Sequence, residues 1–218
     1  MTTSAPGIRH FHRISRLPII AALIVSGTKA LAVPFPVHRP QPPLPRASGM
    51  NEGERVLAPT AFVRFCLRKP TECTSVGSGG SVPIDPQAVR DLIEVNRSVN
   101  QSIRPIRKSA FAGVGTWEVG PHAGDCNDYA VTKRHHLIQR GWPAGALLLT
   151  EVETSWGEAH LVLTVRTSNG DYVLDNLSAA VRPWSATDYR WVRRQSAADA
   201  NTWVSLTAVS RNTTVERI

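Results

Sequence analysis

Six prolines within 14 residues limit what this chain of 218 residues can fold into. They lie between Val33 and Arg46, where fixed φ angles and missing amide donors exclude both a continuous helix and pairing into a sheet. This stretch is therefore predicted to be an extended linker, assigned to residues 33–52. One folded domain is expected over residues 53–218, which is long enough to bury a core.

The residues before the linker have the pattern of an export signal. A basic leader precedes an apolar stretch, Leu17–Gly27, that is too short to span a bilayer. Small residues at Ala30 and Ala32 match the positions that a signal peptidase reads. We therefore expect residues 1–32 to be removed as a signal peptide, and an uncleaved membrane anchor is the alternative.

The formal net charge of +8 does not indicate a nucleic-acid partner. Four basic and no acidic residues lie within residues 1–32, so half of the excess belongs to the leader. The remaining lysines and arginines form no basic block with interleaved aromatic residues. A hydrophobic fraction of 42% also excludes a disordered or fibrous class for the bulk of the chain.

Cys66 and Cys73 are predicted to form a local disulfide. A short helix from Pro59 to Arg68 is followed by Pro70, and a turn of this kind brings two such positions within bonding distance. Exported proteins meet an oxidising compartment, where such pairs persist. A metal pair is the alternative, but C-x6-C is not a usual zinc spacing and the chain holds only three cysteines.

The third cysteine, Cys126, stands at the predicted start of a helix. Turn residues continue up to Gly124, and a helical pattern then runs to about Arg140 before Gly141 ends it. The free backbone amides and the positive dipole end at such a position favour a thiolate and an oxyanion. A reactive thiol and a buried structural thiol both fit this position taken alone.

The side chains of this helix are expected to divide into a core face and an outer face. Residues at helical spacing that would face the core are Ala130, Leu137 and Ile138. The residues expected toward solvent or the helix edge are Lys133, Arg134 and His135.

A histidine and an aspartate lie on a predicted β-hairpin further along the chain. Strands over residues 158–165 and 172–175 flank a turn-rich segment, with His160 near the start of the first and Asp175 at the end of the second. Either residue alone is more often structural, as a core histidine or a strand-end cap. Together with Cys126, in this order, they form a set of nucleophile, base and orienting acid.

The position of the turn decides whether these two residues meet. A loop centred near Thr167 would make His160 and Asp175 direct cross-strand neighbours on one face of the sheet. A tight turn at Asn169-Gly170 would keep the same face but move Asp175 opposite Thr164, four residues along the strand. We therefore predict the wider loop.

The residues around the thiol and the hairpin resemble those of the bacterial transglutaminase-like cysteine proteinases, the family of LapG-like periplasmic proteases. The segments that carry the resemblance are GDCNDYAVTKRHHLIQRGWP at residues 124–143 and GEAHLVLTVRTSNGDYVLDN at residues 157–176. The upstream segment APTAFVRFCLRKPTEC is similar to the same family. The resemblance implies an α+β fold with a papain-like, transglutaminase-type core, in which the nucleophile lies at a helix N-terminus packed on an antiparallel sheet.

The resemblance also implies a triad of Cys126, His160 and Asp175 that acts through a thioester. His160 would accept the thiol proton, Asp175 would hold the imidazole tautomer, and Cys126 would attack an amide carbonyl before water releases the acyl group. The backbone amide of Cys126 is the expected oxyanion donor. Trp117 and His122 are candidates for the second donor; a core position for Trp117 and a solvated turn for His122 are the alternatives.

A calcium site is a further expectation from the resemblance. LapG-like members carry an acidic residue on both sides of the nucleophile, and these residues bind a calcium ion. Here Asp125 precedes the thiol, but Asn127 follows it. An amide oxygen still ligates calcium, but the loss of one negative charge predicts a lower affinity. Asp125 and Asn127 are thus the candidate ligands, and Asp125 fits helix capping equally well.

Three functions are open from the sequence. The resemblance implies a periplasmic thiol endopeptidase, whose partners would be a protein substrate such as a large surface adhesin and a membrane-bound inhibitory receptor. An amidase or transglutaminase would use the same triad with a different acyl acceptor, and the sequence does not separate it from the peptidase. A non-catalytic binding module is the third, and the intact triad argues against it. We expect a monomer.

Overall fold

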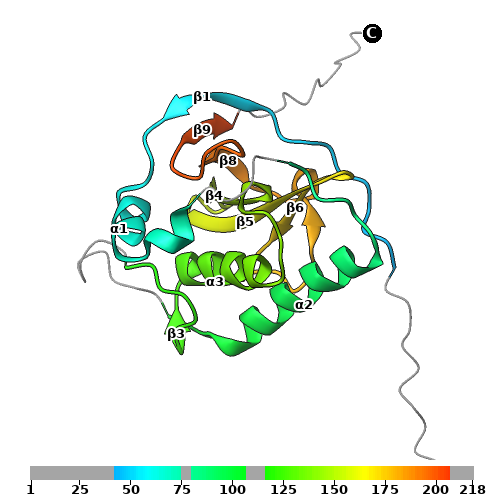
Figure 1. The fold of residues 1–218 in the computed structure, drawn as a ribbon, viewed down its shortest axis with the longest axis horizontal. Helices are drawn as coiled ribbons and strands as arrows, with labels where there is room; N and C mark the ends of the chain where they lie inside the picture. The colour runs from blue at the N-terminus through cyan, green and yellow to red at the C-terminus, as the bar shows by residue number, and fades with distance from the viewer. Residues whose placement is uncertain (1–41, 75–79, 107–115, 207–218) are drawn as a thin grey trace, which may run out of the picture. The chain divides into compact units, whose positions relative to one another are not determined.

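The computed structural model describes residues 42–74, 80–106 and 116–206. The predicted signal peptide and residues 33–41 of the predicted linker lie outside these residues. Within the described ranges, no helix is long and apolar enough to cross a membrane. The folded part combines helices with an antiparallel sheet (Figure 1), which confirms the predicted α+β class.

A seven-stranded antiparallel sheet forms the centre of the fold, in the spatial order β1-β9-β8-β4-β5-β6-β7. The bounds of its strands are β1 Glu52–Val56, β4 Leu147–Glu153, β5 Ala159–Thr167, β6 Gly170–Leu174, β7 Arg182–Pro183, β8 Arg190–Gln195 and β9 Trp203–Leu206. Two further short strands pair in parallel, β2 Arg104–Pro105 and β3 Ala123–Gly124. Strand β5 has neighbouring strands on both edges, β4 and β6, and is almost wholly buried.

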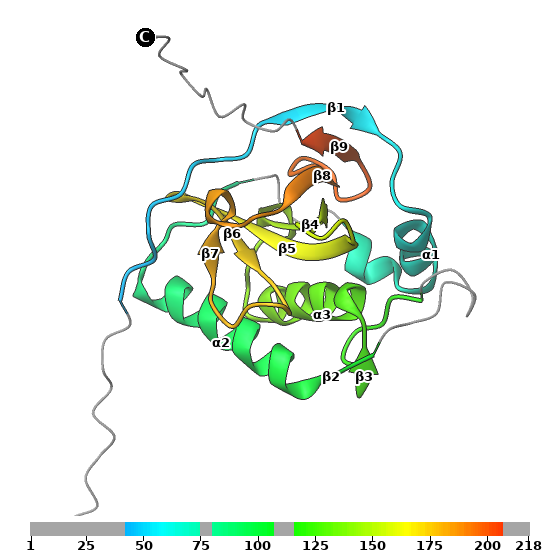
Figure 2. The same cartoon turned by 180° about the vertical axis from the view of Figure 1, so that it is seen from behind.

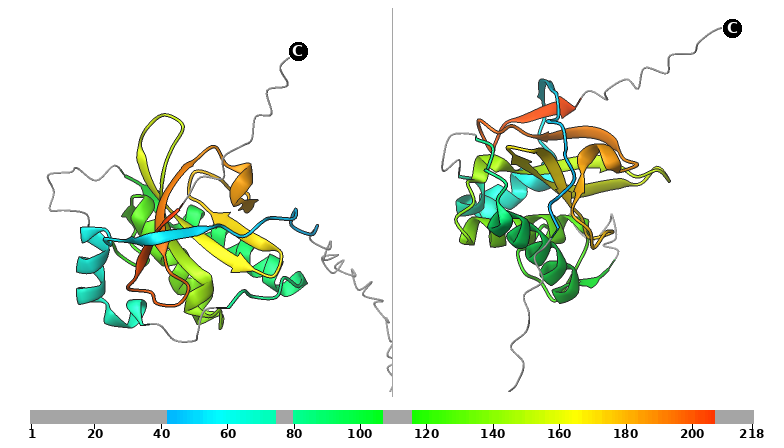
Figure 3. Two further views of the ribbon diagram at one scale, coloured as in Figure 1. Left: turned by 90° about the horizontal axis from the view of Figure 1, so that it is seen from above. Right: turned by 90° about the vertical axis from the view of Figure 1, so that its right-hand side faces the viewer.

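The helices cover one face of this sheet. Their bounds are α1 Thr60–Arg68, α2 Pro86–Ser102 and α3 Cys126–Gln139, with short 3-10 turns η1 Pro70–Cys73, η2 Ala144–Ala146 and η3 Trp184–Ala186. Helix α3 packs on β5 and β4, and α2 packs on α3, so that α3 lies between the sheet and α2 (Figures 1 and 2). The right-hand view of Figure 3 shows α2 and α3 together on one side of the sheet.

The division of α3 into a core face and an outer face was wrong for two residues. Lys133 is fully buried and Arg134 is only 2% exposed, whereas His135 is half-buried. The reason is that α3 is enclosed by the sheet on one side and by other helical segments on the others. The Arg134 guanidinium is accommodated because it donates hydrogen bonds to the carbonyl oxygens of Leu147 and Glu72.

The folded unit includes residues upstream of the predicted boundary at residue 53. Residues 45–50, which we call the strap, run along the hairpin formed by β5 and β6. The Ser48 carbonyl accepts hydrogen bonds from the Asp171 amide at 3.0 Å and from the Trp184 indole at 2.8 Å. Gly170 allows this approach: its φ is +102°, and a Cβ atom there would lie 2.3 Å from the Ala47 backbone.

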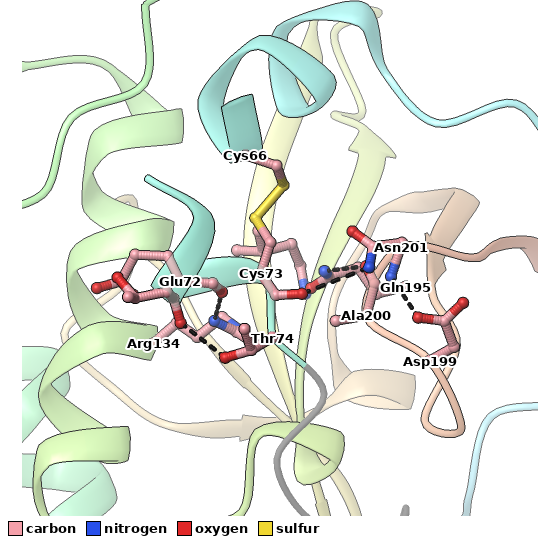
Figure 4. The surroundings of a disulfide bond; sticks show 11 residues. Cys66, Glu72, Cys73, Thr74, Arg134, Gln195, Asp199, Ala200 and Asn201 are labelled. Atoms are coloured by element: carbon pink, nitrogen blue, oxygen red, sulfur yellow. Dashed lines mark hydrogen bonds between the residues drawn. A yellow bond between two sulfur atoms is a disulfide. The ribbon is translucent and has the colours of Figure 1, made fainter. Parts of the chain in front are cut away.

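A disulfide links Cys66 in α1 to Cys73 at the end of η1, with the two Cα atoms 5.6 Å apart. Figure 4 shows the neighbours that attach this bridged segment to the rest of the fold. The Cys73 carbonyl accepts a hydrogen bond from the Asn201 amide group, and the Glu72 carbonyl accepts one from Arg134 of α3. The bridge therefore holds α1 and η1 as one unit against the helix that begins with Cys126.

We expect removal of this disulfide to destabilise the domain. The double substitution Cys66→Ser with Cys73→Ser should lower the free energy of unfolding by about 2–3 kcal/mol, because the unfolded chain regains the entropy of a short loop. Urea denaturation of the unreduced proteins measures the difference. The matched control is Cys126→Ser, which removes a thiol but no bridge; a loss of similar size in this control would contradict the prediction.

Candidate active site

Cys126 is the first residue of α3, and two aspartates hold the helix start around it. Oδ1 of Asp125 accepts a hydrogen bond from the Asn127 amide at 3.1 Å, which satisfies one of the free amides of the first turn. The buried Asp128 carboxylate reaches back, and its Oδ2 accepts from the Asp125 amide at 2.8 Å. This reciprocal capping fixes the backbone on both sides of the thiol.

The glycine before the cap is required by the same arrangement. A Cβ atom on Gly124 would lie 2.4 Å from Oδ2 of Asp128, so any side chain there would displace the capping carboxylate. The other oxygen of Asp128 accepts from the Glu118 amide at 2.9 Å, which ties the preceding segment to the helix. The Gly-Asp-Cys sequence with an aspartate two residues later is therefore a structural unit that orients Cys126.

His160 on β5 meets Asp175, the residue that follows β6. The distance between His160 Nε2 and Asp175 Oδ1 is 2.9 Å, and both side chains are buried. Cys126 lines the same cleft as His160, and its side chain also raises the pKa of this imidazole. The fold thus brings together the three residues that the sequence singled out.

The predicted register of the hairpin was wrong by two residues. Thr167 pairs with Gly170 and Leu163 with Leu174, so the strands are joined by a two-residue turn and Asp175 lies diagonally to His160 instead of opposite it. A shift of two residues keeps the same side-chain face, because the strand repeat is two. Diagonal neighbours remain within reach of an imidazole and a carboxylate, and the contact therefore forms.

The charges of the site favour an imidazolium paired with a carboxylate. Burial alone would lower the pKa of His160, but hydrogen bonds with Asp175 and Cys126 and the charges of these groups raise it to about 9. Burial would raise the pKa of Asp175, but the hydrogen bond and the charge of His160 lower it, helped by the Leu177 amide and by Tyr189. Each member of the pair therefore stabilises the ionised form of the other.

Tyr189 is a site residue that the sequence reading missed. Its hydroxyl donates a hydrogen bond to Oδ2 of Asp175, and its ring centroid lies 5.7 Å from that of His160. Burial and the neighbouring Asp175 raise the pKa of Tyr189, so the hydroxyl stays a donor. No local motif marks this residue, because it precedes β8 and reaches the hairpin only through the order of strands in the sheet.

A cleft of about 480 Å³ opens beside the thiol. Its lining combines the two reacting side chains with residues from three loops: Pro105, Ile106, Asp125, Cys126, Asn127, Thr154, Trp156, Glu158, Ala159, His160, Asn176 and Leu177. Trp117 and His122 are not among them, so the structure does not support either side chain as an oxyanion donor. Trp117 is 3% exposed and packs its ring on Phe62 and Phe65, and His122 is exposed in a turn.

The residues around the thiol do not fit a calcium site. Calcium takes six to eight oxygen ligands, several of them carboxylates. Oδ1 of Asp125 is used in capping and also accepts from the Asn127 side-chain amide, which therefore presents its nitrogen to this carboxylate. Both oxygens of Asp128 accept backbone amides. Among the described residues, no group of three or more His, Cys, Asp or Glu side chains is placed to hold a metal ion.

Comparison with known proteins gives a family match over most of the chain. The model of the bacterial transglutaminase-like cysteine proteinases matches residues 52–211. A search of curated proteins found no match. Among solved structures, Legionella pneumophila LapG is 25% identical, with 52% of this chain and 67% of that chain covered and a TM-score of 0.44. Calcium-bound Legionella pneumophila LapG is 21% identical, with coverage of 66% and 77% and a TM-score of 0.46.

We expect Gly124→Ala to destabilise the domain, because the added methyl group displaces the Asp128 carboxylate from the helix start. The free energy of unfolding should fall by about 1–3 kcal/mol, as for other substitutions that overpack a tight site. Gly49→Ala is the matched control, since nothing lies within 4 Å of a Cβ atom at that position. Equal stability of the two variants in urea denaturation would show that the close approach is not needed.

We expect the stabilisation that Asp175 provides to depend on pH. The pKa of His160 is raised in the folded state, so the pair's contribution is complete below the ordinary histidine value of about 6.5 and is lost as the pH rises through about 9. Because the pKa of Asp175 is lowered, the contribution also declines in acid, below the ordinary aspartate value.

The test compares the wild-type protein with Asp175→Asn across this range. The substitution should lower the free energy of unfolding by an amount on the order of 1–3 kcal/mol near pH 6 and by clearly less at pH 10. Chemical denaturation at each pH measures the difference. A constant difference between pH 6 and pH 10 would mean that the ion pair does not form.

Proposed function

Because this chain belongs to the bacterial transglutaminase-like cysteine proteinases and is a cysteine peptidase, we propose that Cys126, His160 and Asp175 carry out its hydrolysis of peptide bonds. The observation that carries this proposal is the bridging position of His160, which bonds Asp175 through Nε2 and interacts with the Cys126 side chain. A cleft beside the thiol gives a substrate chain access to it.

The proposed reaction follows from this geometry. The Cys126 thiolate attacks the amide carbonyl, the His160 imidazolium protonates the departing amine, and the carbon–nitrogen bond breaks to leave a thioester. Neutral His160 then takes a proton from water, and the resulting hydroxide attacks the thioester, so that the carboxylic acid leaves and the Cys126 thiolate is regenerated beside the His160 imidazolium. Asp175 orients the imidazole and stabilises its charged form in both steps.

The oxyanion of each tetrahedral intermediate needs hydrogen-bond donors. We infer that the backbone amide of Cys126 is one of them, because it lies in the first turn of α3, where amides have no partner within the helix. The positive end of the helix dipole acts in the same direction. No calcium ion enters this mechanism.

The cellular setting is part of the proposal. The leader at residues 1–32 supports export, and the disulfide between Cys66 and Cys73 is suited to an oxidising compartment such as the periplasm. The family resemblance supports a large surface adhesin as substrate and a membrane-bound receptor as inhibitor. We propose that the enzyme acts as a monomer.

Substitution of the triad tests the proposal on fluorescent casein. Cys126→Ala and His160→Ala should each reduce cleavage about 10³-fold or more, and Asp175→Asn should reduce it at least about tenfold. His122→Ala is the matched control for the histidine; it lies outside the cleft and should leave the rate unchanged. Circular dichroism checks that each variant is folded.

Two outcomes would contradict the proposal. Cleavage that persists in Cys126→Ala would exclude the thiol as nucleophile. Products that carry an added amine in place of a new carboxylate, found by mass spectrometry in the presence of lysine-containing peptides, would show acyl transfer instead of hydrolysis.

A further inference from the structure

Large apolar side chains gather at the opening of the cleft that holds Cys126. Seven large apolar residues are exposed in the described part of the chain, and three of these line this cleft: Ile106, Trp156 and Leu177. Trp156 is 65% exposed and Leu177 is 53% exposed. Exposed apolar patches around a polar centre are typical of surfaces that bind another molecule.

Two of these residues, Leu177 and Trp156, lie on segments next to triad residues. Leu177 lies two residues after Asp175 and its amide donates to that carboxylate at 3.0 Å. Trp156 lies in the turn between β4 and β5, three residues before the start of β5, and its indole nitrogen donates to Oε2 of Glu158 at 3.1 Å. The first contact holds the backbone at Leu177 and the second restrains the Trp156 side chain before any substrate arrives, which reduces the entropy lost on binding.

Trp156 and Leu177 also border a second hollow next to the cleft. This hollow has a volume of about 190 Å³ and is lined in addition by Val173, Asp175 and Tyr189, among others. The two apolar side chains therefore stand between the thiol on one side and a small recess on the other. A substrate chain that lies across the thiol would bring a neighbouring side chain against this pair.

Carboxylates outnumber basic side chains in the lining of the cleft, unlike in the whole chain. The sequence holds 25 Lys and Arg residues against 17 Asp and Glu residues. Within the described residues, the cleft lining contains Asp125 and Glu158 and neither lysine nor arginine, and its one basic group, His160, is paired with Asp175. Two carboxylates in a partly enclosed site repel an acidic side chain and attract a basic one.

On the basis of the proposed peptidase activity, we propose that Trp156 and Leu177 form a subsite for an apolar side chain of the substrate. The preferred substrate is a protein segment that carries an apolar residue beside the cleaved bond, with neutral or basic neighbours and no acidic ones. Trp156 and Leu177 select the apolar residue by burying it, and Asp125 and Glu158 exclude carboxylates.

The experiment uses the full protein and a library of peptides from a digested proteome, with cleaved bonds identified by mass spectrometry. The wild-type protein should give an enrichment of apolar residues at one position and a depletion of Asp and Glu nearby. In Trp156→Ala and in Leu177→Ala the enrichment should disappear, and kcat/KM on a preferred peptide should fall roughly tenfold, mainly through KM. Trp156→Phe should retain the preference.

A control substitution removes an exposed apolar side chain elsewhere. Leu67→Ala makes the same chemical change on α1, where Leu67 is 80% exposed and does not line the cleft, and it should leave the cleavage profile unchanged. Glu158→Gln should weaken the depletion of acidic residues while keeping the apolar preference.

The outcomes separate this inference from the function on which it rests. Cleavage that depends on Cys126 but shows no apolar enrichment, or enrichment that survives Trp156→Ala and Leu177→Ala, overturns the subsite and leaves the peptidase in place. Absence of cleavage by the wild-type protein, or cleavage that persists in Cys126→Ala, overturns the proposed function itself.

Discussion

The geometry of the active site depends on one buried carboxylate, that of Asp128. It accepts the Asp125 amide on one oxygen and the Glu118 amide on the other, so a single side chain caps α3 and attaches the segment before it. A buried carboxylate without such donors would cost several kcal/mol, and with them it defines one conformation of the helix start. Residue 124 is a glycine for the same reason, because no side chain fits beside this carboxylate.

The burial of α3 on all sides holds the helix that carries Cys126 in place, and it also buries a lysine, Lys133. A helix with exposed polar residues on one side could shift on the sheet, whereas α3 has neighbours on every side along its middle turns. This burial is unfavourable for Lys133, because its side-chain nitrogen has no hydrogen-bond partner among the described residues. Burial lowers the pKa of Lys133 to about 7, although the charge of Asp175 opposes this shift, so the side chain sheds much of its charge near neutral pH.

Local sequence patterns predicted the secondary-structure elements that carry Cys126, His160 and Asp175. Turn residues up to Gly124, followed by a helical pattern, placed Cys126 at a helix start, and the strand pattern placed His160 and Asp175 on one face of a hairpin. The pairing register was wrong by two residues, but the period of the strand made that error harmless for the contact.

Features that depend on tertiary packing were not accessible in the same way. The burial of Lys133 and Arg134 follows from what surrounds α3, and Tyr189 reaches Asp175 only because of the strand order. The strap was assigned to the linker because it begins at Pro45, the last of six closely spaced prolines that exclude regular structure. Prolines do not prevent carbonyl groups from accepting hydrogen bonds, and it is mainly through carbonyls that the strap binds the hairpin and Trp184.

The pairing of β1 with β9 has a consequence for the order in which the domain can fold. Arg55 of β1 pairs with Val204 of β9, so the first strand of the sheet has no partner until the last strand is present. The segment from Ala123 to Asp175 is contiguous and can assemble the thiol and its base much earlier, because its contacts span shorter stretches of chain. Until the segment that ends at Leu206 is available for pairing, β8 keeps an open edge that is vulnerable to pairing with other chains. The catalytic segment can therefore form before the sheet beside it is closed.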